Sequence, residues 1–448
     1  MRIVIIGAVA AGTAAAAKAS RNDPKAEIVI YEKDRDISYS ACGLPYYIGN
    51  EIADIHEIVP RTGVDFKQMY NVDVLTEHEV LWVDGLAKTL QIKNLSTGDV
   101  FEDVYDKLVI ATGASVKTPQ VEGSSLPHVF SLRTVQNARA MKSYLETKKP
   151  QTAVIAGTGF IGLEMLENLT RLGIDVTLLE KRDAIARHLE PEMSEYLLSL
   201  LREKGVQILL NALIHTIHGD HVVLEDGRTL PAQMVLLATG VKPDTRLAEG
   251  MGLTLGASGS IRVDDRMETS MKDVFACGDC AQTFSAITGQ PNYRPLGSTA
   301  AKTGRIAGDT ATGGVMRYRG NLSASIFRVF DWTVATVGLS TKEAIASGFD
   351  PVPCLHDQPD RPEYLGGQEM RIWAIADRQS GRLLGAQIIG PQGVDKRIDV
   401  LASLITFGAK AEDLPHIDLT YAPPFSTTRD PVHYTGMLLE SAIRKGKK

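Results

Sequence analysis

The sequence of 448 residues predicts an α/β chain with two Rossmann-like dinucleotide-binding domains followed by a smaller α+β domain. Two short apolar strands, at 3–6 and 153–156, each lead into a glycine-rich turn and then a helix, which is the pattern of a βαβ nucleotide-binding unit. Two further buried strands end in the same Ala-Thr-Gly turn, at 111–113 and 238–240. The repetition indicates two similar folds, one inserted in the other.

The first unit spans residues 1–33. Its turn contains Gly7 and Gly12, and its second strand ends at Glu32. A carboxylate in this position accepts hydrogen bonds from the ribose hydroxyls of an adenosine, while the pyrophosphate binds at the N-terminus of the helix. Val9 stands where the fingerprint has its second glycine, so the match is incomplete. We still expect this unit to bind a dinucleotide.

The second unit has the complete fingerprint. The three glycines of its turn are Gly157, Gly159 and Gly162. Its second strand ends at Glu180, whose carboxylate is suited to the ribose 2′-hydroxyl of NADH. Lys181 and Arg182 follow directly and are suited to the 2′-phosphate of NADPH. The choice of cofactor therefore stays open, with a preference for NADH.

The rest of the chain completes the predicted domains. Residues 274–281 form a strand and an exit loop in which Asp279 is suited to the polar side chain of a flavin. From about residue 322, strand-like runs and a closing helix at about 394–407 predict a separate α+β domain. The expected domains are a discontinuous first domain of residues 1–112 and 243–321, an inserted second domain of residues 113–242, and a C-terminal domain of residues 322–448.

The composition of the chain argues against several classes of function. The formal net charge of −6 argues against a nucleic-acid or anionic-membrane partner, and no apolar run reaches the roughly 18 residues of a membrane span. Four cysteines are too few for a disulfide framework, and the pair Cys277 and Cys280 has no second pair to complete a zinc site. The chain begins on a predicted strand with no room for a signal peptide, so we expect a cytoplasmic protein, with the basic run 444–448 as a solvated tail.

Cys42 is the candidate for redox chemistry. It lies in the segment 38–47, directly after the first dinucleotide-binding unit, which places a single thiol beside a bound cofactor. The thiolate is the reactive form, and a free thiol with a pKa of about 8.5 is mostly protonated at neutral pH. We therefore expect the cofactor ring and a helix that begins near Gly43 to stabilise the thiolate. The alternative is a small buried apolar residue, a common role of free cysteine.

The order of two fingerprints, two Ala-Thr-Gly turns, the loop at Asp279 and a C-terminal α+β domain resembles the glutathione-reductase-like flavoprotein disulfide reductases. The segments 38–46 and 421–425 resemble the single-cysteine branch, which includes coenzyme A disulfide reductase, NADH oxidase, NADH peroxidase and NAD(P)H-dependent polysulfide or persulfide reductases. The resemblance implies FAD in the first domain, NADH or NADPH in the second, and a homodimer formed by the third. In that dimer, the C-terminal domain of one subunit completes the active site of the other.

The resemblance also assigns roles to individual residues. At the cofactors it implies Gly7, Gly12, Glu32, Lys33, Ala111, Thr112, Gly113 and Asp279 for FAD, and Gly157, Gly159, Gly162 and Glu180 for NAD(P)H. Tyr421 and Tyr364 are the implied hydroxyls that face the partner's cysteine, where a phenol can protonate a leaving thiolate. The C-x-x-C pair at 277 and 280 becomes a by-product of the flavin loop.

The substrate is expected to be a small sulfur compound linked to coenzyme A. The oxidase and peroxidase pattern has a histidine where this chain has Ala10, so oxygen chemistry lacks its acid and hydrogen-bond donor. The candidate contacts to the substrate are Lys18, Arg21, Ser38, Arg61 and Arg429. The chain departs from the coenzyme A disulfide reductase pattern at Ala14, Lys18 and Ala41, which stand for threonine, glutamine and asparagine.

Three functions follow from these observations. The leading one is an FAD-dependent NAD(P)H reductase of coenzyme A disulfide, coenzyme A persulfide or polysulfide, in which Cys42 cycles through a mixed disulfide. The second is an NADH oxidase or peroxidase in which the cysteine becomes a sulfenate. The third is an electron-transfer flavoprotein that uses FAD and NADH to reduce a protein acceptor, with Cys42 incidental.

Overall fold

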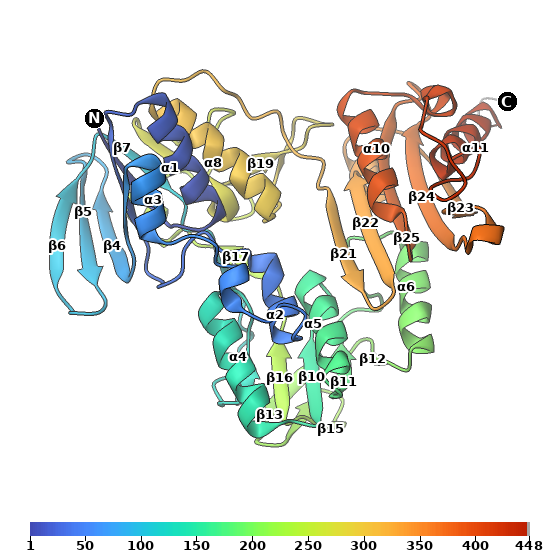
Figure 1. Ribbon diagram of the computed structural model, residues 1–448, viewed down its shortest axis with the longest axis horizontal. Helices are drawn as coiled ribbons and strands as arrows, with labels where there is room; N and C mark the ends of the chain where they lie inside the picture. The colour runs from blue at the N-terminus through green and yellow to red at the C-terminus, as the bar shows by residue number, and fades with distance from the viewer. Residues whose placement is uncertain (446–448) are drawn as a thin grey trace.

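The computed structural model describes residues 1–445, which form three parts (Figure 1). Positions 446–448, the end of the predicted basic tail and of the C-terminal domain, lie outside the described residues. Two parts are each built on a five-stranded parallel sheet, and the third on a five-stranded antiparallel sheet. The predicted α/β fold with a C-terminal α+β domain is confirmed.

The first part contains the N-terminus. Its main elements are β1 (Arg2–Ile6), α1 (Ala10–Asn22), β2 (Glu27–Tyr31), α2 (Leu44–Ile48), α3 (Gly63–Tyr70), β3 (Val72–Leu75), β4 (His78–Asp84), β5 (Thr89–Asn94), β6 (Val100–Val104), β7 (Lys107–Ile110), α7 (Arg246–Gly250), β18 (Val274–Ala276), β19 (Thr283–Phe284), β20 (Pro291–Asn292) and α8 (Gly297–Ala311). The parallel sheet has the order β18-β7-β1-β2-β3, and β4, β5 and β6 form a separate antiparallel sheet. Because β18 pairs with β7, this part is assembled from two distant stretches of the chain.

The second part lies between those two stretches. Its elements are β8 (Ala114–Val116), β9 (Val129–Phe130), α4 (Val135–Lys148), β10 (Thr152–Ala156), α5 (Phe160–Arg171), β11 (Asp175–Leu179), α6 (Pro191–Glu203), β12 (Gln207–Leu209), β13 (Ile214–Ile217), β14 (His221–Leu224), β15 (Thr229–Pro231), β16 (Met234–Leu237) and β17 (Val241–Pro243). Its parallel sheet has the order β12-β11-β10-β16-β9, and β13, β14 and β15 form an antiparallel sheet.

The chain enters and leaves the second part through a two-stranded ribbon. β8 leads in and β17 leads out, and the two pair antiparallel, with Ala114 opposite Pro243 and Val116 opposite Val241. Thr112 Oγ1 also donates a hydrogen bond to the carbonyl of Asp244, at 2.6 Å. We propose the domain boundaries predicted from the sequence, and the grouping of the sheets supports them.

The glycine turns of the two parallel sheets have matching geometry. Gly7 donates its N–H to the carbonyl of Tyr31, and Gly157 donates to that of Leu179, each at 2.8 Å. A Cβ atom on Gly12 would lie 1.8 Å from the Gly7 carbonyl oxygen, and one on Gly162 would lie 2.0 Å from the Gly157 oxygen. Each helix therefore packs backbone against backbone on its own turn, which only glycine allows.

Helix α2 crosses from the first part to the second. Although it follows β2 in sequence, it lies beside α4 and α5 in Figure 1, and Leu44 and Ile48 are buried in one core with the apolar side chains of α5. Lys142 on α4 donates a hydrogen bond to the Tyr47 carbonyl at 2.8 Å. The start of α2 is therefore fixed by the second part as well as by the first.

The third part contains β21 (Ser325–Val329), β22 (Trp332–Gly338), α9 (Thr341–Ala346), β23 (Pro351–Pro359), β24 (Glu369–Asp377), β25 (Leu383–Gly390), α10 (Val394–Thr406) and α11 (Pro431–Lys445). Its sheet has the order β21-β22-β25-β24-β23. α10 agrees with the helix predicted at 394–407, but the prediction that this helix closes the domain was wrong, because α11 follows it. α11 includes Arg444 and Lys445, so the first two residues of the predicted tail are helical.

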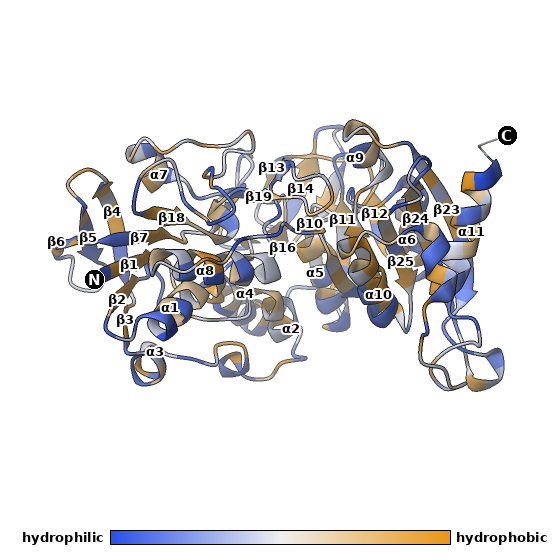
Figure 2. Ribbon diagram, turned by 90° about the horizontal axis from the view of Figure 1, so that it is seen from above, coloured by the Kyte–Doolittle hydropathy of each residue, from blue (hydrophilic) through white to orange (hydrophobic). Residues whose placement is uncertain are grey.

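Apolar residues are concentrated on the strands, while the outer faces of the helices are largely hydrophilic (Figure 2). β25 is buried along its whole length, and β1 and β10 are buried over their central residues. This is the pattern of sheets covered on both faces. Within residues 1–445, no helix is both long and apolar enough to cross a bilayer.

Candidate active site

Cys42 lies on a short 3-10 turn, Ala41–Gly43, between β2 and α2. Ser38 adopts a left-handed conformation, with φ of 52°, and donates its N–H to the Ala8 carbonyl at 2.8 Å. This bend returns the chain to the first glycine turn. All four cysteines are free, and Cys42 is the one with an exposed side chain. The structure therefore presents one accessible thiol on a loop that is hydrogen-bonded, through Ser38, to the first glycine turn.

The side chains of this chain do not stabilise the Cys42 thiolate. Desolvation raises the pKa of the thiol, because protein atoms pack around the sulfur although the residue is exposed, and the nearby Glu164 carboxyl raises it further. Arg133 acts in the opposite direction but does not reverse the shift. A helix does begin at Leu44, as expected. Our expectation of a thiolate stabilised at a helix N-terminus is therefore not met by the protein groups alone.

Glu164 on α5 is a buried carboxyl beside this thiol. Desolvation and the negative charge of Glu167 raise its pKa to about 7, while a hydrogen bond from Tyr46 and the charge of Arg328 lower it. A group with this pKa changes charge near neutral pH, where most reductases work. Glu164, with Tyr46 as a hydrogen-bond partner, is therefore a carboxyl beside Cys42 that can gain or lose a proton near neutral pH.

Glu167 joins three segments that are distant in sequence. It is 0% exposed and accepts hydrogen bonds from Arg328 Nε at 3.1 Å and from the Phe330 N–H at 3.0 Å. Arg171 Nη2 lies 2.8 Å from the same carboxylate. Arg328 also pairs with Glu51, which follows α2, and its guanidinium lies over the Tyr46 ring at 5.2 Å. The junction fixes α2 against α5 and β21.

The predicted flavin residues converge at the carboxyl ends of the first parallel sheet. Gly7 follows β1, Glu32 follows β2, the Ala-Thr-Gly turn follows β7, and Asp279 lies in the loop after β18. Glu32 is 6% exposed and accepts hydrogen bonds from the Ala8 and Asp34 N–H groups at 2.6 and 3.0 Å. Ligands of open α/β sheets bind at this edge. The donor set and the bare glycine turn fit a dinucleotide.

The glycine turn and carboxylate of the second parallel sheet form a binding cradle like that of the first sheet. Glu180 is buried, accepts a hydrogen bond from the Thr158 hydroxyl, and accepts another from the Arg182 N–H at 3.1 Å. Gly159 has open space where a Cβ would lie, so the backbone is free to approach a phosphate. Lys181 and Arg182 are exposed beside this carboxylate. The residues fit NAD(P)H, with the carboxylate already ordered for a ribose.

The chain was compared with known protein families. It matches the family described as "Pyridine nucleotide-disulphide oxidoreductase" over residues 1–304, and the dimerisation domain of the same family over residues 324–431. The chain belongs to the pyridine nucleotide-disulphide oxidoreductases. FAD and NAD(P)H are therefore its cofactors, as predicted, and we propose that the two cradles hold them in that order.

Relatives cover nearly the whole chain. An "NADH oxidase" of Methanocaldococcus jannaschii is 33% identical over 99% of both chains, and a "Coenzyme A disulfide reductase" of Staphylococcus haemolyticus is 29% identical over 97% of this chain and 98% of the relative. The solved structure of "a NAD-Dependent Persulfide Reductase from A. fulgidus" is 36% identical, with a TM-score of 0.95 over 100% of this chain and 84% of that one. This oxidoreductase is thus similar to proteins named as an oxidase, as a disulfide reductase and as a persulfide reductase.

The predicted substrate residues fall into two groups. Ser38 lies in the Cys42 loop, and Lys18 and Arg21 lie on α1, where Lys18 pairs with Asp309 at 3.1 Å and Arg21 contacts the Tyr70 ring. Arg61 is exposed on the loop before α3. The remaining predicted active-site residues, Arg429, Tyr364 and Tyr421, are exposed on the C-terminal domain. Among the described residues no hydrogen bond or ion pair joins them to the Cys42 loop, and both views place β23 and α11 away from α2 (Figures 1 and 2).

Three residues at this site were not predicted from the sequence: Arg133, Glu164 and Tyr46. Arg133 forms an ion pair with Asp279 at 2.6 Å and lies near Cys42, so it occupies the predicted flavin site. Glu164 and Tyr46 have the sequence signal of polar groups inside otherwise apolar runs. A carboxylate two residues after Gly162, on the buried face of a helix, could have been recognised. Arg133 precedes α4 and carries no such signal.

We expect Glu164 to control the reactivity of Cys42. In protein stripped of flavin, Glu164→Gln will lower the thiol pKa, because it removes a negative charge that opposes the thiolate. Alkylation of Cys42 by iodoacetamide at about pH 8 will then be roughly threefold faster than in the wild type. The rate is followed by mass spectrometry of the Cys42 peptide, with Cys42→Ser as the blank. An unchanged or slower rate contradicts the assignment.

Proposed function

We propose that this oxidoreductase is an FAD-dependent NAD(P)H reductase of coenzyme A disulfide, coenzyme A persulfide or polysulfide, with Cys42 as the redox centre. The observation that carries the proposal is the single exposed thiol on a loop hydrogen-bonded to the first glycine turn. Cys277 and Cys280 are fully buried, and Cys354 is half-buried on β23. Because the same loop has no second cysteine, the oxidised form of Cys42 pairs with an external sulfur or becomes a sulfenic acid, and we propose the external sulfur.

The residues support a balanced reaction. The Cys42 thiolate attacks one sulfur of a disulfide RSSR, so that a bond from Cys42 to that sulfur forms and RS⁻ leaves. FAD and NAD(P)H, when bound, supply the two electrons that reduce this mixed disulfide and restore the thiolate. The sum is RSSR + NAD(P)H + H⁺ → 2 RSH + NAD(P)⁺. Glu164 and the tyrosines are placed in our proposal as the groups that protonate the leaving thiolates.

Oxygen is the second candidate acceptor, favoured by the identity to an NADH oxidase. Ala10 at the start of α1 argues against it, because a methyl group neither donates a hydrogen bond nor transfers a proton. The deciding experiment is anaerobic oxidation of NADH and NADPH with coenzyme A disulfide, coenzyme A persulfide and polysulfide, compared with Cys42→Ser. Turnover with one of these that needs Cys42 supports the proposal. Failure with all three, but rapid oxidation in air, assigns the oxidase function.

We also propose that the working unit is a homodimer with shared active sites. Tyr364, Phe425 and Tyr421 are 76, 70 and 50% exposed in the single chain, on a domain of the dimerisation family. Such aromatic side chains are typical of the buried core of an interface.

The shared site is testable by subunit mixing. Cys42→Ser and Tyr421→Phe subunits will each be inactive as homodimers, yet their heterodimers will contain one intact site. Random reassortment of an equal mixture gives about a quarter of the wild-type rate. Absence of any recovery shows that each site is built within one chain.

We expect NADH to be preferred to NADPH. Glu180→Gln keeps an oxygen for Thr158 and Arg182 but removes the charge that repels a 2′-phosphate. The ratio of kcat/KM for NADPH to that for NADH will rise on the order of tenfold, or ~1.4 kcal/mol. Glu195→Gln, exposed on α6, is the control and leaves the ratio unchanged. An unchanged ratio in Glu180→Gln shows that the carboxylate does not select the cofactor.

A further inference from the structure

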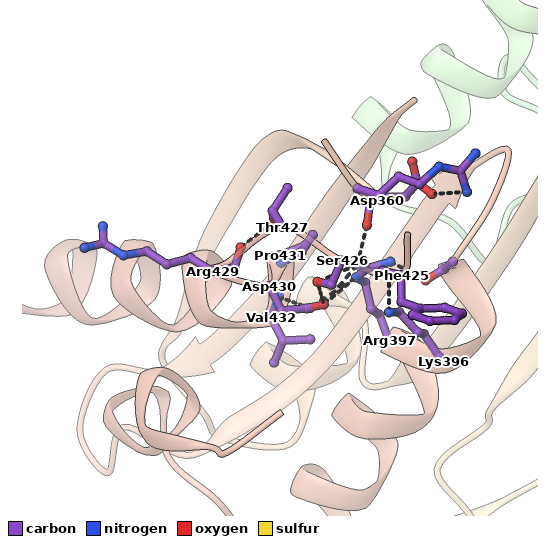
Figure 3. A network of polar contacts seen from close by, with 12 residues as sticks. Asp360, Lys396, Arg397, Phe425, Ser426, Thr427, Arg429, Asp430, Pro431 and Val432 are labelled. Carbon is purple, nitrogen blue, oxygen red and sulfur yellow. Dashed lines mark hydrogen bonds and ion pairs between the residues drawn. The ribbon is translucent and has the colours of Figure 1, made fainter. Parts of the chain in front are cut away.

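Two exposed loops of the C-terminal domain meet at one buried arginine. The first loop, 360–368, joins β23 to β24 and carries Tyr364. The second, 421–430, precedes α11 and carries Tyr421. Arg397 on α10 lies beneath both and is 1% exposed, although both tyrosines reach solvent. Figure 3 shows its guanidinium pointing between the two loops.

Arg397 bonds to both loops and to the start of its own helix. Nη2 donates to the Asp360 carbonyl at 2.8 Å and lies 2.9 Å from Asp430 Oδ2, and Nε donates to Asp430 Oδ1 at 3.1 Å. Ser426 Oγ donates to the same Asp430 carboxylate at 2.7 Å. Nη1 donates to the Gly393 carbonyl at 3.0 Å. The planar guanidinium group of Arg397 therefore links the first residue of the 360–368 loop to the last residue of the 421–430 loop.

Hydrogen bonds join the two ends of the first loop, so the position of Tyr364 at its tip depends on the position of those ends. Asp360 and Gln368 exchange two hydrogen bonds, from the Gln368 N–H to Asp360 Oδ1 at 2.8 Å and from the Asp360 N–H to the Gln368 carbonyl at 3.0 Å. Arg361 Nε donates to the Leu365 carbonyl at 3.0 Å. These bonds flank Tyr364 on both sides.

The second loop is closed in the same manner. The Phe425 N–H donates to the Ala422 carbonyl at 2.9 Å, and Lys396 Nζ donates to the Phe425 carbonyl at 2.7 Å (Figure 3). Lys396 is the neighbour of Arg397 on α10. Adjacent residues of one helix therefore hold this loop at its middle and at its end.

The stability of the folded domain does not by itself explain the buried ion pair of Arg397 and Asp430. Burial raises the pKa of the Asp430 carboxyl, but Arg397 and the hydrogen bonds around it lower it overall, so the pair is ionised. A buried ion pair is often no more stabilising than apolar side chains of the same volume. The planar fork of arginine does fix direction and spacing, which neither lysine nor an apolar residue does.

We propose that Arg397 is a positioning residue that sets the spacing of the two loops, so that Tyr364 and Tyr421 enter the partner subunit's Cys42 site together. This inference rests on the proposed function and adds to it a residue that touches neither cofactor nor substrate. Arg397→Lys keeps the charge and loses the fork. The kcat for the sulfur substrate will fall roughly 10- to 100-fold, as small misplacements of catalytic groups do.

A structural defect would change other quantities as well. In Arg397→Lys, reduction of the bound flavin by NADH and the KM for NADH will match the wild type, because these do not depend on the loops. The dimer will still form, because the aromatic side chains of the loops are unchanged. Arg371→Lys is the matched control. Its guanidinium bonds to Asp357 at 2.8 Å and joins β24 to β23 in the same domain without bonding to either loop, so the kcat of this variant will be unchanged.

Subunit mixing gives the sharpest test. In heterodimers of Arg397→Lys with Cys42→Ser, one site combines an intact Cys42 with intact loops from the other chain. About a quarter of the wild-type rate will return, although Cys42→Ser alone is inactive and Arg397→Lys alone is strongly impaired. No recovery, an unaffected kcat, or slowed flavin reduction overturns the inference. If Arg397→Lys does not fold, Lys396→Met is the second variant, because it removes only the hydrogen bond to the Phe425 carbonyl. Its kcat will fall about threefold. An unchanged kcat in this variant overturns the inference.

The two proposals fail in different ways. If Cys42→Ser keeps sulfur turnover, the proposed function itself is wrong. If turnover needs Cys42 and Tyr421 but not the Arg397 fork, only the positioning role is lost.

Discussion

Replacing Cys42 by serine will abolish turnover of the sulfur substrate while leaving reduction of the flavin by NAD(P)H intact. The rate with substrate will fall by at least about 10³-fold, because a hydroxyl at this position forms no mixed disulfide. The bound flavin will still be reduced by NADH at a rate within about twofold of the wild type, since the second cradle is untouched. Anaerobic stopped-flow absorbance measures the two half-reactions separately.

The control is Cys354→Ser. This cysteine is half-buried on β23, where burial raises its pKa to about 12, so it is a poor nucleophile and its replacement will leave both half-reactions unchanged. Retained sulfur turnover in Cys42→Ser would point instead to the electron-transfer function, in which the acceptor is a protein. Loss of flavin reduction in that variant would mean that Cys42 supports cofactor binding rather than chemistry.

Substitutions of two fingerprint glycines, Gly12 and Gly162, will each impair the binding of a different cofactor. Gly12→Val will yield protein without FAD, because its side chain would enter the Gly7 carbonyl at 1.8 Å and push the helix from its turn. Gly162→Val will yield flavoprotein that NADH does not reduce, because the equivalent contact with Gly157 is 2.0 Å. The flavin content is read from visible absorbance, and NADH binding from the rate of flavin bleaching.

Each glycine variant is the control for the other, and Gly250→Ala on α7 is a third, since its Cβ would meet open space. Gly250→Ala will retain both cofactors. If Gly162→Val also loses FAD, the two parts do not fold as separate units. If Gly12→Val keeps FAD, the first cradle is not the flavin site.

The repeated units were the most predictable feature, because strand, glycine turn and carboxylate are local in sequence. Gly7, Glu32, Gly157 and Glu180 could be paired with their neighbours by spacing alone. The raised pKa of the Cys42 thiol could not be predicted in this way. It depends first on burial and then on Glu164, which lies near the thiol only when α2 packs on α5. We expect the flavin ring and the helix that begins near Gly43 to stabilise the thiolate, and the surrounding side chains act in the opposite direction.

The C-terminal domain shows the same division. Its strands and α10 follow from apolar periodicity, whereas α11 was missed between the loop at 421–430 and a basic run taken as a tail. The Arg397 junction joins positions separated by 33 and 37 residues. A buried arginine gives no signal in a single sequence, since arginine on a helix is usually solvated.

The ribbon of β8 and β17 has a consequence for how the chain can be divided. Because Ala114 and Pro243 are paired, the ends of the whole second part lie only about 5 Å apart. The second part is therefore inserted into the first part at the position of a hairpin loop. The length of this insertion does not change where the first part leaves off and resumes. A different unit with equally close termini could be grafted there, provided that it also offers an apolar surface to α2, which packs on α5 in the present second part.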